Sequence, residues 1–207
     1  MRNLIVMTTG GEFDLAPWMR DDRNYDIVFL NWGKYDIHGL GIDVHNIASI
    51  NFGPLKNIYW YFRNYGIGEY EYYWFPDDDL EFTKQNEYFD FIRMVQFDLS
   101  QPSMTADSNE NHDFLYHKGD NLFRDVPFVE IMCPCFSRAA LERNFWTFDL
   151  NHSGYGVDLL WAKHEQPYVV DAFQIRHSRP QQMCAIAERM GWPDPQDELK
   201  EIQENYL

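Results

Sequence analysis

The sequence has little positive charge and no long hydrophobic run. It carries 17 basic residues against 33 acidic ones, a net charge of −16. Binding to nucleic acid or to anionic membrane surfaces depends on Lys and Arg, so this balance disfavours both as partners. A small anionic ligand remains compatible, because a bound divalent cation reverses the local sign of a site.

No stretch reaches the roughly 18 consecutive apolar residues that a membrane-spanning helix needs. The apolar run near the N-terminus, NLIVM, passes directly into Thr-Thr-Gly-Gly. We therefore expect neither a membrane span nor a signal peptide.

Cysteine is also scarce. The three residues, Cys133, Cys135 and Cys184, form neither a disulfide framework nor a CxxC pattern. Reduced thiols fit this usage best and predict a cytoplasmic protein. The 207 residues suffice for one domain, and an aromatic content of 17% suits a cleft that stacks on a base or a sugar.

The most informative stretch is EYYWFPDDDLEF, from Glu71 to Phe82. Tyr72 to Phe75 reads as a buried strand, which Pro76 ends. Asp77, Asp78 and Asp79 follow, and three adjacent carboxylates beside an apolar strand repel one another unless a cation compensates them. The stretch predicts a site for a hard divalent cation and phosphate, the alternative being a solvated acidic turn.

Two apolar runs before it predict strands of an α/β sheet. The first spans Asn3 to Met7 and is followed by Thr8, Thr9 and Gly10, and the second spans Tyr25 to Asn31. Ligands of such sheets bind at the carboxyl ends of the strands, so these polar residues are candidates for nucleotide binding, although a plain turn would look the same. We predict an α/β fold, with helices flanking a mainly parallel central sheet.

Helices are predicted from Pro54, with Lys56 in its first turn, and from a cap at Thr83 to about Phe97. Lys56 is either a phosphate ligand or a solvated side chain. Residues 14–22 fit a short helix or a loop, and 35–52 a loop with one short element. The stretch FDLSQPSM is expected to end a strand at Gln101 and Pro102.

The polar stretch from Ala106 to Asp125 is interpreted as a substrate loop or lid. A strand over Phe128 to Phe136 is expected to be an edge strand, or to end, at Pro134. Ser137 is expected to cap a short helix. Further along, Gly154 and Gly156 predict a tight loop before a helix containing Asp158.

The last predicted strand, Tyr168 to Ile175, precedes Arg176, His177 and Arg179. The tail from Gln181 to Leu207 reads as two helices separated around Pro193 and Pro195. We therefore divide the chain into a catalytic domain, 1–180, and a helical extension, 181–207, that packs on the same domain.

Five segments in this order resemble the DUF707-type group of glycosyltransferase-like proteins, whose pattern is similar to that of nucleotide-sugar glycosyltransferases of the GT-A fold. The resemblance covers roughly Asn3 to Pro180. The segments are YEYYWFPDDDLEF, FDLSQPSM, FVEIMCPCFSR, GYGVDLLW and IRHSRP.

This resemblance implies a DxD motif that holds Mn²⁺ or Mg²⁺ against the diphosphate of a nucleotide sugar, with a UDP-type donor. Asp77 and Asp79 match the metal ligands, Asp78 faces the ribose or reaches the metal through water, and His177 resembles the histidine that many such enzymes add to the metal. Asp158 matches the general base of inverting enzymes; in a retaining enzyme it would orient the sugar. An N-cap for Asp158 and a structural hydrogen bond for His177 are the alternatives.

The sequence thus predicts a metal-dependent glycosyltransferase acting on a hydroxyl of a glycan or glycolipid. Thr8, Thr9 and Asn31 would line the base and ribose pocket. The alternative is a non-catalytic module on the same fold that binds a carbohydrate or nucleotide sugar, and a nucleotide-sugar hydrolase is a weaker one. The chain is short for such an enzyme, which leaves the acceptor open.

Overall fold

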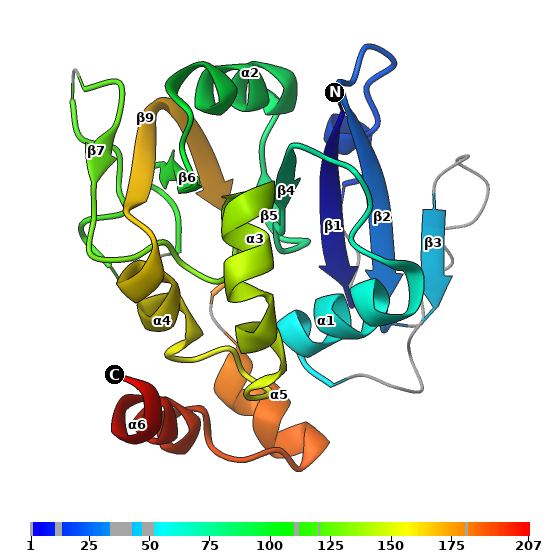
Figure 1. The fold of residues 1–207 in the computed structure, drawn as a ribbon, viewed down its shortest axis with the longest axis vertical. Helices are drawn as coiled ribbons and strands as arrows, with labels where there is room; N and C mark the ends of the chain where they lie inside the picture. Colours follow the sequence, from blue (N-terminus) through cyan, green and yellow to red (C-terminus); the bar gives the residue numbers. More distant parts are fainter. Residues whose placement is uncertain are drawn as a thin grey trace.

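Both N-terminal apolar runs are strands, and they lie side by side in parallel, as their sequences predict. The computed structural model describes residues 2–10, 14–33, 43–46, 52–109, 112–119, 121–180 and 182–207. β1 (Asn3–Thr9) is buried throughout and pairs with β2 (Tyr25–Asn31) from Asn3 opposite Tyr25 to Thr9 opposite Asn31. Their carboxyl ends therefore lie at the same edge of the sheet (Figure 1).

Nine strands of the described residues form one sheet, in the order β3-β2-β1-β4-β8-β6-β9-β5, with β7 also paired to β9. The remaining strands are β3 (Asp43–Asn46), β4 (Tyr72–Trp74), β5 (Leu80–Glu81), β6 (Leu99–Met104), β7 (Arg124–Asp125), β8 (Cys135–Ser137) and β9 (Pro167–His177).

The sheet is mixed and not purely parallel, although its two longest ladders, β1 with β2 and β6 with β9, are parallel. Four pairs are parallel, namely β1 with β2, β1 with β4, β2 with β3 and β6 with β9. The other four pairs are antiparallel, and β8 takes part in two of them, with β4 and with β6. β8 enters the sheet from an irregular segment rather than through a crossover helix, so nothing constrains it to be parallel.

Two proline positions also differ from expectation. β8 begins one residue after Pro134 and lies inside the sheet, so Pro134 precedes an internal strand and does not mark an edge. β6 continues through Pro102 to Met104, beyond the predicted end. The ladder between β6 and β9 shifts register between Pro102 and Ser103, where the proline cannot donate a ladder hydrogen bond.

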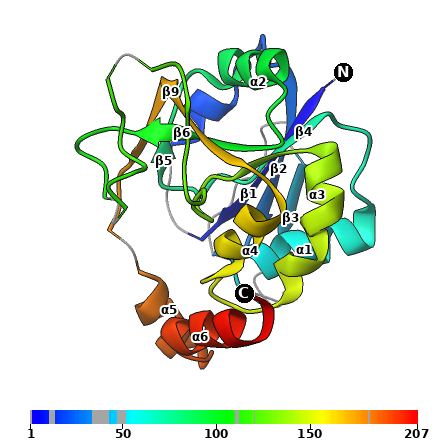
Figure 2. The ribbon, with the colours of Figure 1, turned by 60° about the vertical axis from the view of Figure 1, so that its left-hand side comes forward.

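Helices flank the sheet, and α2 lies at the opposite end of the molecule from α5 and α6 (Figures 1 and 2). The helices are η1 (Ala16–Trp18), α1 (Pro54–Tyr65), α2 (Gln85–Val95), α3 (Arg138–Asn144), η2 (Phe145–Asp149), α4 (Val157–His164), α5 (Met183–Met190) and α6 (Pro195–Tyr206).

The predicted helix starts are partly confirmed. Ser137 caps α3, because its Oγ accepts a hydrogen bond from the backbone N–H of Ala140 at 3.2 Å. Thr83 does not cap α2; the N-cap residue is Lys84, which makes no capping hydrogen bond with its side chain. The tail forms two helices on either side of residues 191–194, as predicted. Of residues 35–52, only 43–46 and Phe52 lie among those described, and 43–46 form β3.

The core is built around Trp74, a fully buried residue of β4. The rings of Phe82, Tyr88 and Phe89 pack on it with centroids 5.2 to 5.9 Å away. Its indole N–H donates to the carbonyl of Cys133 at 2.9 Å, so the one polar atom of this side chain is satisfied. These aromatic contacts hold in place the strand that leads into the acidic triplet.

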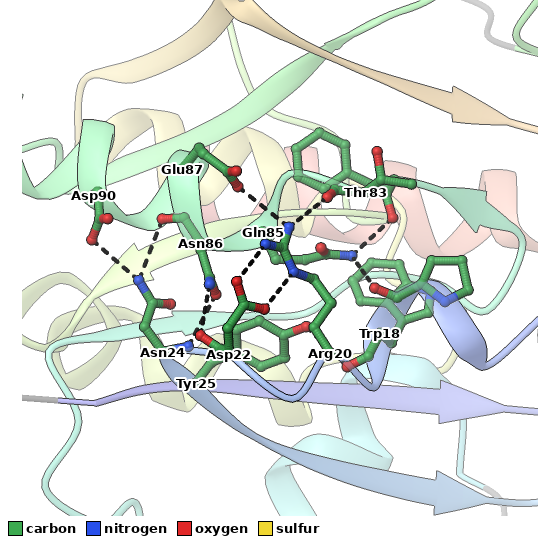
Figure 3. Close-up of polar contacts among 12 residues, drawn as sticks. Trp18, Arg20, Asp22, Asn24, Tyr25, Thr83, Gln85, Asn86, Glu87 and Asp90 are labelled. Carbon is green, nitrogen blue, oxygen red and sulfur yellow. Dashed lines mark hydrogen bonds and ion pairs between the residues drawn. The ribbon is translucent and has the colours of Figure 1, made fainter.

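A polar network joins the segment before β2 to the start of α2 (Figure 3). Arg20 donates two hydrogen bonds to the carboxylate of Asp22 and one to the carbonyl of Thr83. The side chain of Asn86 accepts from the backbone N–H of Asn24 at 2.9 Å. These contacts fix the loop that enters β2 against the helix that follows the triplet.

No helix among the described residues is long and apolar enough to cross a membrane.

The ends of α2 and α5 supply a matched test of backbone strain. Gln96, which follows α2, is exposed and has left-handed backbone angles (φ 64°, ψ 46°), which cost an L-residue roughly 1 kcal/mol. We expect Gln96→Gly to raise the free energy of unfolding by about 1 kcal/mol in urea denaturation.

Gly191 has the same conformation after α5 (φ 69°), with no atom within 4 Å of an added Cβ. Gly191→Gln should lower the free energy of unfolding by about the same 1 kcal/mol. A drop in stability for Gln96→Gly would contradict the assignment of strain to this position.

Candidate functional site

The acidic triplet begins where the chain leaves β4, and hydrogen bonds hold it on both sides. The backbone N–H groups of Phe75 and Asp77 donate to the carbonyls of Pro134 and Met132, at 3.0 and 2.7 Å. On the other side, Asp77 forms an isolated parallel bridge with Thr8. The sheet therefore places Asp77 directly beside the carboxyl end of β1.

The residues predicted for nucleotide binding lie at this same edge. Thr8, Thr9 and Asn31 are buried, and Asn31 is opposite Thr9 in the ladder. The backbone N–H of Gly10 donates to Asp78 Oδ2 at 2.9 Å, which ties the first loop to the triplet. A Cβ at Gly10 would lie 1.9 Å from the ring of Trp32, so the close approach of this indole requires glycine there.

Asp79 and His177 meet because β5 pairs with the end of β9, with Leu80 opposite His177. His177 Nε2 lies 3.3 Å from Asp79 Oδ2. The other ring nitrogen, Nδ1, lies 2.5 Å from the carbonyl of Asn109, which can only accept, so Nδ1 carries a proton. Ser178 donates from both its N–H and its Oγ to the carbonyl of Asp79, which fixes this turn.

Arg179 is a third partner of the triplet, and sequence reasoning assigned it no role. Its guanidinium pairs with Asp78 Oδ1 and, from Nε, with Asp79 Oδ2 at 3.2 Å. The pairing links positions 100 and 101 residues apart. No local pattern indicates it; only the antiparallel register of β5 and β9 brings these residues together.

The environments of Asp77 and Asp79 shift their pKa values in opposite directions. Burial raises the pKa of Asp77 well above its usual value, and the negative charges of Asp79, Asp78 and Glu130 add to this effect. Burial also acts to raise the pKa of Asp79, but the hydrogen bond and charge of His177 and the charge of Arg179 outweigh it, so its pKa is lowered. Asp79 is therefore the ionised member of the pair.

The donor chemistry of Asp77, Asp79 and His177 fits a divalent cation of the Mn²⁺ or Mg²⁺ type. Asp79 Oδ1 is buried and has no hydrogen-bond partner within the described structure, an arrangement that calls for a cation. However, no three His, Cys, Asp or Glu side chains among the described residues are already arranged around a metal position. The oxygens of the triplet are partly occupied by Arg179 instead.

Asp158 lies in the first turn of α4, one residue after its start, and is not the N-cap, which is Gly156. Its carboxylate accepts one hydrogen bond, from the N–H of Leu159 at 2.9 Å. Burial raises the pKa of Asp158 to about 7. A carboxylate with this pKa can exchange a proton near neutral pH, which is what a general base requires.

Glu130 and Tyr155 link Asp158 electrostatically to the triplet. The charge of Glu130 helps to raise the pKa of Asp77. Burial raises the pKa of Tyr155 to about 12, and the charges of Glu130 and Asp158 add to this effect. Glu130 is held by the hydrogen bond of its backbone N–H to Gln101 Oε1 at 2.6 Å. The residue types alone did not single out Glu130 and Tyr155.

Lys56 is separate from the contacts above. It lies in the first turn of α1, just after Phe52, whose carbonyl accepts from His152 Nδ1 at 2.8 Å. Lys56 itself makes no hydrogen bond or ion pair within the described structure. The structure therefore does not join Lys56 to the other predicted site residues by a hydrogen bond or an ion pair within the described residues.

The polar stretch Ala106–Asp125 is partly anchored to the sheet where it is described. Ser108 Oγ accepts from the N–H of His177 at 3.0 Å. Arg124 binds the buried carboxylate of Asp171 at 2.9 Å, and His117 Nδ1 lies 3.6 Å from the same carboxylate. The first part of this stretch therefore helps to place His177.

The loop before Asp158 is held by the C-terminal helix. The buried carboxylate of Glu198, in α6, accepts from the backbone N–H groups of His152 and Ser153 at 2.9 and 2.8 Å. At Gly156 an added Cβ would lie 2.9 Å from Leu199 and 3.1 Å from Ile202. The last helix thus sets the path of the chain into α4.

Comparison with solved structures identifies the fold. The structure of S. aureus TarS 1-349 in complex with UDP-GlcNAc matches with a TM-score of 0.59 and 14% identity, over 88% of this chain and 60% of that one. GalNAc-T7 with UDP, GalNAc and Mn²⁺ matches with a TM-score of 0.65 and 10% identity, over 88% of this chain and 44% of that one. The chain has the GT-A fold of glycosyltransferases.

The likeness extends to the fold alone, since the identities are low. The chain spans 59% of the length of TarS 1-349 in its complex with UDP, where the TM-score is 0.55 and the identity 14%. No family model matches the sequence. No curated protein matches it either.

Glu198 provides a test of the clamp on the loop before Asp158. In Glu198→Gln an amide NH₂ group replaces one of the two acceptor oxygens. Two donors then face each other, and one backbone N–H loses its acceptor. We expect the free energy of unfolding to fall by about 1–3 kcal/mol in urea denaturation.

The matched control is Glu201→Gln, an exposed position on the same helix, which should change stability by less than about 0.5 kcal/mol. Equal effects of the two substitutions would mean that the Glu198 clamp is not a stabilising contact.

Proposed function

We propose that this chain is a metal-dependent glycosyltransferase that moves a sugar from a UDP-type nucleotide sugar to a hydroxyl group of a glycan or glycolipid. The observation that carries the proposal is the meeting of Asp77–Asp79 and His177 at the carboxyl end of β1, within a GT-A fold. The solved neighbours add support, because they were determined with UDP-GlcNAc, with UDP, and with UDP, GalNAc and Mn²⁺.

In this proposal the ends of β1 and β2 bind the nucleotide. Thr8, Thr9 and Asn31 line the base and ribose pocket, since ligands of α/β sheets bind at this edge. Gly10 allows a close backbone approach. Asp78 belongs to the same part of the site through its hydrogen bond with Gly10. Lys56 is assigned to the phosphates because it lies in the first turn of α1.

Asp77, Asp79 and His177 would hold the divalent cation, with the protonated Nδ1 of His177 directing Nε2 toward it. When bound, such a cation neutralises the charge that develops on the leaving diphosphate. The unpaired Asp79 Oδ1 supports this assignment.

Asp158 is proposed as the base that prepares the acceptor. Its ionised carboxylate takes the proton of the acceptor hydroxyl while that oxygen forms a bond to the anomeric carbon and the bond from this carbon to the diphosphate breaks. A pKa of about 7 keeps enough of the group ionised at neutral pH and makes it basic enough to accept the proton. In a retaining reaction the same carboxylate would orient the donor sugar.

Several finer predictions remain part of the proposal. They are membership of the DUF707-type group, a cytoplasmic location, and the absence of nucleic acid from the partners, which rests on the charge of −16. The proposal also keeps the division at residue 180, and the hydrogen bonds of Glu198 to the backbone of His152 and Ser153 support the packing of the extension on the domain that it follows. The chain spans only 59% of the length of TarS 1-349, so the likeness to TarS assigns no acceptor to it.

The first test is ligand binding by wild type and an Asp79 variant. UDP-sugars with Mn²⁺ should raise the melting temperature of the wild type, since a ligand of the native state stabilises it. Asp79→Asn keeps the shape of the side chain but removes the charge, and calorimetry should show Mn²⁺ binding at least about tenfold weaker.

Glu81→Gln is the control, because Glu81 is an exposed carboxylate two residues away whose partner is Arg176. It should bind Mn²⁺ as the wild type does. Wild type that binds neither Mn²⁺ nor any UDP-sugar would refute the proposal. Binding with release of UDP but no transfer to any acceptor would favour the hydrolase, and binding without turnover the non-catalytic module.

The second test is the pH dependence that Asp158 imposes. With the donor from the first screen, kcat/KM should rise about tenfold per pH unit below about 7 and level off above it, as the carboxylate ionises. Asp158→Asn should lower kcat by about 10²- to 10⁴-fold. The exposed Asp149→Asn serves as control and should leave both unchanged.

Stability gives an independent readout of the same group. Burial raises the pKa of Asp158 in the folded protein to about 7, from an ordinary value of 3.8, so its stabilising contribution is complete below about pH 4 and is lost as the pH rises through about 7. The melting temperature of Asp158→Asn should accordingly change less between pH 5 and 8 than that of the wild type. Identical changes would show that Asp158 does not titrate in this range.

A further inference from the structure

Arg179 pairs with two carboxylates of the triplet, and one of them, Asp79, is a proposed cation ligand. Arg179 Nε lies 3.2 Å from Asp79 Oδ2, and its terminal nitrogen pairs with Asp78 Oδ1. The two carboxylates are only 15% and 11% exposed, so water screens these ion pairs weakly. Arg179 thus balances negative charge on both Asp78 and Asp79 in the absence of metal, beside His177 at Asp79.

Two cations cannot share the Asp79 carboxylate without a cost. A divalent metal binds carboxylate oxygen at about 2.0–2.6 Å, which brings it close to a guanidinium on the same carboxylate. Like charges at such a separation repel strongly in a partly buried site. The metal and Arg179 therefore compete for the negative charge of the Asp79 carboxylate.

We propose that Arg179 is an internal counter-ion that sets the metal affinity of the site: it neutralises Asp78 and Asp79 when the metal is absent and is displaced from Asp79 when the metal binds. This inference rests on the proposed function, because it concerns the same metal site. It assigns to Arg179 a positioning role and no contact with the reacting atoms.

The surroundings of Arg179 allow this movement, whereas those of His177 do not. The Arg179 side chain is 37% exposed and has solvent to move into. His177 is 11% exposed and is held by the carbonyl of Asn109. The backbone between them is fixed by the two hydrogen bonds of Ser178 to the carbonyl of Asp79, so the side chain alone has to move.

Arginine also suits the task chemically. Its guanidinium stays charged at all physiological pH values, so the triplet is neutralised whenever the metal is absent. A lysine or histidine here would lose its charge more readily in a partly buried position. The uncompensated repulsion among three carboxylates is thereby avoided in the metal-free protein.

The test is Mn²⁺ binding by calorimetry to wild type, Arg179→Met and Arg176→Met. Methionine keeps the length and removes the charge. We expect Arg179→Met to bind Mn²⁺ on the order of tenfold more tightly than wild type, the size of a typical coupling between two sites. Arg176 pairs with Glu81 and Asp107 outside the triplet, so Arg176→Met should bind as wild type does.

Thermal unfolding supplies the second readout. Without metal, Arg179→Met should melt below wild type, because its triplet has lost a counter-ion, and saturating Mn²⁺ should raise its melting temperature by more than that of wild type. Arg179→Lys restores the charge and should bring Mn²⁺ affinity back toward the wild-type value. A lower melting temperature combined with tighter Mn²⁺ binding separates competition from simple misfolding.

The outcomes distinguish this inference from the proposed function. Equal or weaker Mn²⁺ binding by Arg179→Met, with wild type binding well, overturns the inference and leaves the metal site standing. Binding by Arg179→Met alone supports the inference in its strongest form. If neither wild type nor Arg179→Met binds Mn²⁺, while both are folded, the metal site itself is wrong and the inference falls with it.

Discussion

The site depends on one constraint, the fixed exit of the chain from β4. Trp74 is locked by its packing and by its hydrogen bond to Cys133. The next residues are held by hydrogen bonds to Pro134 and Met132 on one side and by the bridge from Asp77 to Thr8 on the other. Because the backbone is bound on both sides, the first carboxylate of the triplet cannot move away from its neighbours to reduce their repulsion. The charge of the triplet must instead be balanced by positive groups beside it, such as His177 and Arg179.

The electrostatic character of the site follows from this. The chain balances the triplet unequally: Asp77 is left in a setting that favours its neutral form, and Asp79 in one that favours its ionised form. Burial raises the pKa of Asp158, in α4, to about 7. A carboxylate with this pKa can both accept and release a proton near neutral pH. Carboxylates with divergent protonation preferences are typical of a functional site. The raised pKa values of Asp77 and Asp158 lower stability at neutral pH, whereas the lowered pKa of Asp79 adds to it.

The fold class and the parts of the site that follow single strands could be predicted from sequence. Continuous apolar runs indicated β1 and β2, and the aromatic strand pointed to the triplet. The antiparallel insertion of β8 was not predictable, because its three residues have no periodic pattern and its place depends on neighbours distant in sequence. Arg179 was missed for the same reason. The roles proposed for His177 and Asp158 come from the resemblance to glycosyltransferases, because a histidine after a strand and an aspartate in the first turn of a helix are common in proteins of every function.

The separation in sequence between the triplet and Arg179, 100 residues from Asp79, has a consequence for synthesis. On the ribosome, the chain through β4 emerges long before β9, and domains form as their segments become available. Until β9 pairs with β5, the nascent triplet has neither His177 nor Arg179 beside it and must remain hydrated. The pairing of these two strands is therefore a late event that completes the binding edge, and a nascent chain stalled before residue 177 would carry its acidic loop without the groups that balance it.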